Sequence, residues 1–128
     1  MSELTAIQKA RAAAEAGLER KASNPVVLDV HELVSFADAF VFLTGGSDRQ
    51  VKAIAEAIQK ALKRHDETPL GVEGLQDGRW VLMDLNDVIV HIFQPEVREH
   101  YDLERLWSDA PRVELDLQPP DDLQRSAS

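Results

Sequence analysis

The segment AFVFLT, residues 39–44, constrains the fold of this chain more than any other. Its apolar side chains fall on both faces of an extended strand, because successive side chains of a strand point in opposite directions. A strand that is apolar on both faces belongs inside a sheet that is covered on both sides. The sequence therefore predicts a layered domain in which this strand is internal.

The neighbouring segments predict an α/β domain with an α+β-like mixed sheet. Apolar residues at helical spacing indicate helices, and short β-branched or alternating runs indicate strands. In chain order, the predicted elements are a helix over 2–20, strands over 26–30 and 39–44, a helix over 48–64, a short edge strand near 70–73, strands over 79–85 and 88–93, and helical turns over 96–100 and 103–107. Asn86-Asp87 predicts a hairpin, so at least one strand pair is antiparallel. Asp102 is expected to cap the last helical turn.

The length of 128 residues fits one domain, which we expect to span residues 1–110. The remaining residues, 111–128, contain three prolines, several acidic residues and a polar end. This composition predicts a mostly disordered C-terminal tail.

Composition excludes several classes of protein. The chain has no cysteine, so it forms no disulfide and no thiolate metal site. It has no apolar run of about 20 residues and no secretory signal pattern at its N-terminus, so a cytoplasmic protein is the simplest prediction. The formal net charge of −9 argues against broad binding of nucleic acid backbones and suits a basic partner surface or simple solubility.

The turn GGSDRQ lies where the internal strand leads into the helix over 48–64. It is either a tight turn with a helix cap, Ser47 and Gln50 forming a capping box, or an anion cradle. The second interpretation suggests a metal-dependent nucleotidyltransferase that would use this turn with Asp84 and Asp87. Those carboxylates lie three positions apart at the hairpin turn rather than two apart on one strand face, so the metal-binding pair of such an enzyme is missing.

Histidines offer no further catalytic pattern. No pair among the four has the spacing of a helical zinc site, and no serine can be joined to a histidine and an aspartate from sequence alone. His91 interrupts an apolar strand and shares a face with Ile89 and Phe93. It is either a hydrogen-bonded histidine of the core or a functional residue.

Aromatic and acidic residues gather in the C-terminal part of the chain. Trp80, Tyr101 and Trp107 are of the types enriched in interface hot spots. If the hairpin forms, Glu96, Asp102 and neighbouring acidic residues follow at the same end of the sheet as Trp80. Residues 95–128 carry nine acidic and four basic residues, which is over half of the net negative charge. This pattern is either an interaction patch or an ordinary solvated helix face above core aromatics.

Taken together, these motifs resemble the ribosomal silencing factor family, also called the Iojap family. The resemblance covers about residues 4–109 and rests on ELVSFADAFVFLTGGSDRQVKAIAEAI and GRWVLMDLNDVIVHIFQPEVREHYDLERLW. It implies a nucleotidyltransferase-like mixed sheet of four to five strands without the catalytic carboxylates, no enzymatic activity and no cofactor. It also implies a translation repressor that binds the large ribosomal subunit through the ribosomal protein numbered fourteen, blocks joining of the small subunit when nutrients are scarce, and forms homodimers.

The family motif, combined with the hairpin, selects a set of expected partner-binding residues. They are Trp80, Asp84, His91, Glu96, Tyr101, Asp102 and Glu104. Two alternatives stay open on the sequence alone: the nucleotidyltransferase described above, and a structural dimerisation protein with no ribosomal role.

Overall fold

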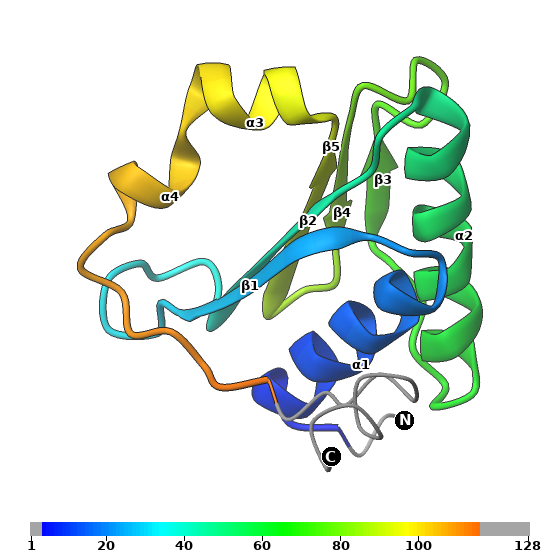
Figure 1. The fold of residues 1–128 in the computed structure, drawn as a ribbon. Coiled ribbons are helices and arrows are strands. Elements are labelled where there is room, and N and C mark those ends of the chain that lie inside the picture. The colour runs from blue at the N-terminus through cyan, green and yellow to red at the C-terminus, as the bar shows by residue number, and fades with distance from the viewer. Residues whose placement is uncertain (1–3, 116–128) are drawn as a thin grey trace, which may run out of the picture.

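Five strands form one mixed sheet in the computed structural model, which describes residues 4–115 (Figure 1). The order of the strands in the sheet is β1-β2-β5-β4-β3. In chain order the elements are α1 (Ala6–Glu19), β1 (Ser23–Asp29), β2 (Ala39–Thr44), α2 (Asp48–Lys63), β3 (Gly71–Glu73), β4 (Trp80–Asp84), β5 (Val88–Phe93), α3 (Pro95–Tyr101) and α4 (Leu103–Leu106). The predicted mixed sheet packed with helices is confirmed.

Strand β2 is internal, as its apolar pattern predicts. It pairs antiparallel with β1 on one side and parallel with β5 on the other, and all six of its residues are buried. β5 in turn pairs antiparallel with β4 through the predicted hairpin, in a register that places Trp80 opposite Phe93. This register brings the start of β4 to the same end of the sheet as the end of β5, where α3 begins.

Helices α1 and α2 cover one face of the sheet (Figure 1). Alanines on α1 allow the two helices to approach closely over the buried side chains of α2, such as Ile54 and Ile58. Gly17 completes this contact, because a Cβ atom there would lie 2.7 Å from Cδ1 of Leu43. Small residues on α1 therefore let it pack directly against both α2 and β2.

The opposite face of the sheet carries an aromatic core. Phe40, Phe42 and Phe93 are buried there, and α3 and α4 lie on this side (Figure 1). α3 begins directly after β5 with Pro95 at its first position, where the missing N–H of proline costs no helical hydrogen bond. The chain therefore turns immediately from the sheet onto its aromatic face.

Local boundaries differ from the sequence prediction at several points. The helix predicted over 2–20 is α1, which begins after Thr5; Thr5 forms a capping box with Gln8, and residues 1–3 lie outside the described residues. β1 begins at Ser23, earlier than predicted, because an edge strand tolerates Pro25. The helical turn predicted over 103–107 is the four-residue helix α4, which buries none of its residues and leaves Leu106 69% exposed.

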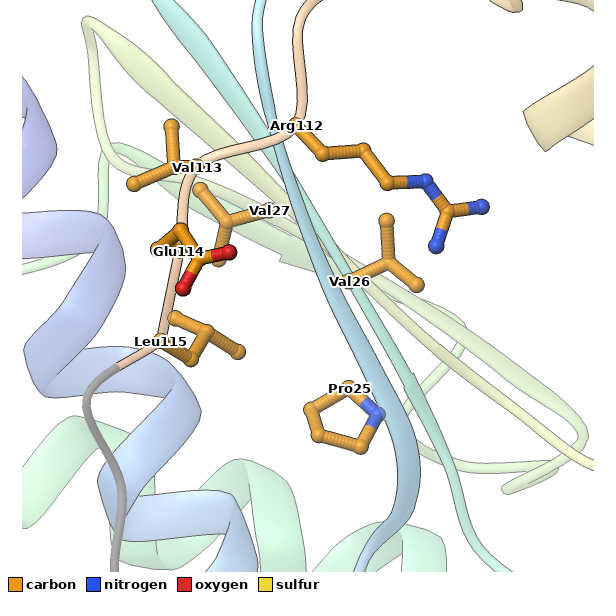
Figure 2. A pocket seen from close by; sticks show the side chains of 7 residues that line it. All are labelled: Pro25, Val26, Val27, Arg112, Val113, Glu114 and Leu115. Carbon is orange, nitrogen blue, oxygen red and sulfur yellow. The ribbon is translucent and has the colours of Figure 1, made fainter.

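Part of the predicted tail lies against β1. The Val113 N–H donates to the carbonyl of Val27 at 2.8 Å, and the Asp29 N–H donates to the carbonyl of Pro111 at 2.9 Å. Next to these two hydrogen bonds, a groove of about 320 Å³ lies between Pro25–Val27 and Arg112–Leu115 (Figure 2). The rest of the tail, from residue 116, lies outside the described residues. Within residues 4–115, no helix has the length and apolar character that crossing a membrane requires.

Candidate partner-binding surface

Trp80 and Tyr101 form an aromatic pair at one end of the sheet. Their ring centroids lie 4.8 Å apart, although the two residues come from β4 and from the end of α3. Tyr101 is 53% exposed and Trp80 is half-buried. Aromatic pairs with an exposed part are the side chains that most often anchor protein partners, because they bury a large area at a small entropic cost.

His91 lies behind this pair, inside the aromatic core. It is 9% exposed, and its Nδ1 accepts a hydrogen bond from Nε1–H of Trp80 at 3.1 Å. Burial lowers the pKa of His91 from 6.5 to about 4, so the ring is neutral at physiological pH. A neutral ring with an unprotonated Nδ1 fixes the direction of the Trp80 indole. His91 therefore supports the surface from below.

Glu96 and Asp102 are exposed on either end of α3. Asp102 has a left-handed backbone (φ 47°, ψ 50°) and joins α3 to α4, but its side chain makes no capping hydrogen bond. The predicted capping by Asp102 is therefore wrong, because the left-handed conformation turns the residue away from the N–H groups of α4. Its carboxylate is available to a partner beside Tyr101.

Two of the predicted partner-binding acids occupy other positions. Glu104 accepts a hydrogen bond from Nε–H of Arg98 at 2.9 Å, and its Oε2 lies 3.7 Å from NH2 of Arg112. Its negative charge is therefore paired with arginines of the same chain. Asp84 shares a face of β4 with Trp80 but lies four residues further along the strand, roughly 13 Å away. Its carboxylate accepts the Asn86 N–H at 2.9 Å. The structure thus brings together Trp80, His91, Tyr101 and Asp102. Glu96 lies at the opposite end of α3 from Tyr101.

The possible enzyme site does not form. The Gly46 N–H donates to Oε1 of Gln50 at 2.6 Å, and the Gly45 N–H donates to the carbonyl of Phe93 at 3.1 Å, so these amides are not available to an anion. The expected capping box is only half present: Oγ of Ser47 accepts the Gln50 N–H, while the Gln50 side chain bonds to Gly46 and to the end of α1. The GGSDRQ turn is a structural junction.

The carboxylates of the nucleotidyltransferase alternative are also separated. Asp87 pairs with the buried ammonium of Lys9 at 2.7 Å, on the α1 side of the sheet, whereas Asp84 is held by its own turn. Among residues 4–115 there is no group of three or more histidine, aspartate or glutamate side chains placed to hold a metal ion. The two aspartates therefore do not form the metal-binding pair that this reaction needs.

Comparison with known proteins agrees with this geometry. Residues 3–128 match the family described as "Ribosomal silencing factor during starvation". The chain belongs to the ribosomal silencing factor family. The ribosomal silencing factor RsfS of Bacillus subtilis is 40% identical over 105 residues, which is 82% of this chain and 89% of that protein. The RsfS of Halalkalibacterium halodurans is 41% identical over 98 residues, which is 77% of this chain and 84% of that protein.

Solved structures show the same fold. A crystal structure of a Chromobacterium violaceum protein superimposes with a TM-score of 0.80 at 35% identity and covers 90% of this chain and 95% of that chain. The family is named for silencing ribosomes and is not known as a family of enzymes. The expectation of a non-enzymatic protein and the family resemblance are therefore both confirmed.

One residue of this region was not among the sequence candidates. Arg98 lies on α3, three residues before Tyr101, and its guanidinium connects α3 with β1, β2 and α4. The only signal in the sequence is its position one helical turn before the tyrosine, and an arginine at such a position is normally a solvated surface residue.

Proposed function

We propose that this protein silences translation by binding the large ribosomal subunit through the ribosomal protein numbered fourteen, so that the small subunit cannot join. Membership of the ribosomal silencing factor family supports a ribosome-associated role. The observation that carries the proposal to this surface is the half-exposed Trp80–Tyr101 pair, with Asp102 exposed beside it.

The chemistry of this surface suits a protein partner with a basic face. The two rings supply desolvated contact area, and Asp102 and Glu96 supply negative charge around them. Charges at the rim of an interface mainly steer encounter and fix the register, whereas buried aromatic anchors provide most of the affinity. The acidic chain as a whole would be repelled by ribosomal RNA, so contact with a ribosomal protein is favoured.

Sedimentation of ribosomal subunits tests this proposal. Purified large subunits are incubated with the protein, small subunits are then added, and the mixture is separated on a sucrose gradient. We expect the protein to travel with the large subunit and the peak of joined ribosomes to decrease. If the subunits join normally while the protein stays at the top of the gradient, the proposal is wrong.

Two accompanying properties belong to the same proposal. The protein would act in the cytoplasm, where ribosomal subunits are found, and would form homodimers in the absence of the ribosome. Light scattering at several protein concentrations tests the second property, because a mass near 14.3 kDa throughout would contradict it.

A further inference from the structure

The guanidinium group of Arg98 connects α3 with several other elements next to the proposed binding surface. The side chain is 11% exposed. Its NH1 donates to Oγ1 of Thr44 and to the carbonyl of Asn24, both at 2.7 Å, and its Nε donates to Oε1 of Glu104 at 2.9 Å. The guanidinium carbon lies 5.7 Å from the centre of the Phe93 ring. One side chain of α3 thus contacts four other parts of the molecule.

These partners lie at fixed points of the sheet. Thr44 is the last residue of β2, and Phe93 is the last residue of β5 and pairs with Thr44 in register. Asn24 stands at the irregular start of β1, with a left-handed backbone (φ 51°). Because these strand ends are held by the sheet, Arg98 ties α3 to a rigid frame.

α3 has little other attachment to the sheet. Val97 is the one buried residue of this seven-residue helix. A helix of two turns is not stable by itself and takes its orientation from its tertiary contacts. Hydrogen bonds to a charged donor contribute more than neutral ones, so the Arg98 contacts are the main polar attachment of α3.

Tyr101 depends on this attachment. It lies three residues after Arg98, a spacing that places the two side chains next to each other on the surface of the helix. The carbonyl of Arg98 also accepts the Asp102 N–H at 2.9 Å, which ends α3 directly after Tyr101. The position of the tyrosine ring over Trp80 is therefore set by how α3 is held.

We propose that Arg98 is a positioning residue for partner binding: it anchors α3 to the ends of β1 and β2 and thereby holds Tyr101 against Trp80. This inference rests on the proposed function, because that function makes the aromatic pair the contact surface. Arg98 itself does not contact the partner. Lysine cannot replace it fully, since a single ammonium lacks the planar fork that reaches Glu104 and the strand ends at the same time.

The indole N–H signals of a protein labelled with ¹⁵N provide a direct readout. The chain has two tryptophans, and Trp80 reports on the contact with Tyr101. The ring centroid of Trp107 lies 5.2 Å from that of Phe40, so Trp107 reports whether the end of α4 remains docked. In Arg98→Met we expect the Trp80 signal to shift while the Trp107 signal stays in place. We expect affinity for large ribosomal subunits to fall about tenfold or more, with Arg98→Lys intermediate in both measurements.

Thr44→Val is the second variant, in case Arg98→Met fails to fold. It removes one acceptor of Arg98 and keeps a β-branched residue in β2, a strand that β5 separates from Trp80 on β4. We expect a smaller shift of the Trp80 signal in the same direction and a smaller loss of affinity. Lys9→Met is the matched control for stability, because Lys9 is also a buried cation with several partners but lies on the other face of the sheet.

The outcomes separate the two proposals. If the Trp80 signal is unchanged in a folded Arg98→Met or Thr44→Val variant, or if Lys9→Met shifts it equally, Arg98 is only structural and the inference is wrong. If the Trp80 signal shifts but affinity does not change, Arg98 positions Tyr101 and the aromatic pair is not the ribosome-binding surface. If wild-type protein does not bind large subunits at all, the proposed function fails while the Trp80 signal still tests the positioning.

Discussion

The indole N–H of Trp80 donates a hydrogen bond to the unprotonated Nδ1 of His91, and the two atoms lie 3.1 Å apart. The bond joins neighbouring strands, and it needs the neutral form of the histidine. Through this bond, a polar residue in the middle of an apolar strand supports Trp80, which contacts the exposed Tyr101. Protonation of His91 would remove the acceptor and place a charge among phenylalanine rings.

This bond predicts how stability depends on pH. Since the pKa of His91 is about 4 in the folded protein and near 6.5 when unfolded, the unfolded chain binds more protons between these values. The contribution of His91 is therefore present above pH 6.5 and is lost as the pH falls toward 4, by at most about 1.4 kcal/mol per pH unit. Urea unfolding of wild type and His91→Gln at several pH values checks this, because glutamine offers Trp80 an acceptor that does not titrate.

The difference in unfolding free energy between these two proteins should shrink as the pH falls from 6.5 to 4. Carboxylates that titrate in the same range are common to both proteins and cancel in the comparison. Parallel curves would contradict the assigned pKa direction.

Replacing either ring of the aromatic pair should weaken ribosome binding strongly. We expect Trp80→Ala and Tyr101→Ala each to raise the dissociation constant for large subunits by roughly 30-fold or more, the size of an interface hot spot. Phe36→Ala is the matched control, since Phe36 is 62% exposed but lies before β2, at the other end of the same aromatic face. If Phe36→Ala and Tyr101→Ala both fold and lose the same affinity for large subunits, the ribosome contact lies outside the Trp80–Tyr101 pair.

Removing the exposed charges should act on association rates. Asp102→Asn keeps a residue that tolerates the left-handed backbone (φ 47°), and Glu96→Gln keeps the shape of an exposed side chain. We expect the double variant to retain its unfolding free energy, to associate several-fold more slowly at low salt, and to lose part of the salt dependence of binding. Stopped-flow association at two ionic strengths measures this, and an unchanged salt dependence would exclude these charges from the interface.

Lys9 should contribute to stability and not to binding. Lys9 is 4% exposed, and its ammonium group donates to the carbonyl of Leu85 and pairs with Asp87 and Glu67. Burial by itself lowers the pKa of Lys9, but the hydrogen bonds and charges of Asp87 and Glu67 raise it more, so the pKa lies above 10.5. We expect Lys9→Met to lower the unfolding free energy by about 2–4 kcal/mol at pH 7, because two carboxylates then lose their cation.

The sign of this contribution also has a pH test. A raised pKa in the folded protein means that the contribution of Lys9 is complete below pH 10.5 and is lost as the pH rises through the folded value. The difference in unfolding free energy between wild type and Lys9→Met, measured by urea unfolding, should therefore become smaller above that pH. Lys60→Met is the control: Lys60 forms an exposed pair with Glu56 at 3.5 Å, and its loss should cost less than about 0.5 kcal/mol.

Much of the framework follows from local patterns in the sequence. The internal position of β2, the helix over Asp48–Lys63 and the hairpin at Asn86-Asp87 are all visible in the spacing of apolar residues and in the turn. These features are set by periodicity within one segment, which burial then enforces. The family motifs carry the same information, because they are composed of these segments.

The use of individual side chains is a different matter. Glu104 looks like a surface acid in the sequence, yet its charge is paired with Arg98 of the preceding helix. His91 looks like a candidate anchor, yet strand pairing places it beneath Trp80. In both cases the decisive partner comes from another element, so no local pattern could indicate it.

The sequence by itself determined that this chain folds around a covered strand and presents aromatic and acidic residues after its hairpin. Only the tertiary structure decided that Tyr101 lies against Trp80, that Arg98 holds α3 in place, and that Asp87 pairs with Lys9. The physical reason is that element formation depends on periodic burial along the chain, whereas these contacts depend on the register of the sheet and on the docking of a short helix that has no stable orientation alone.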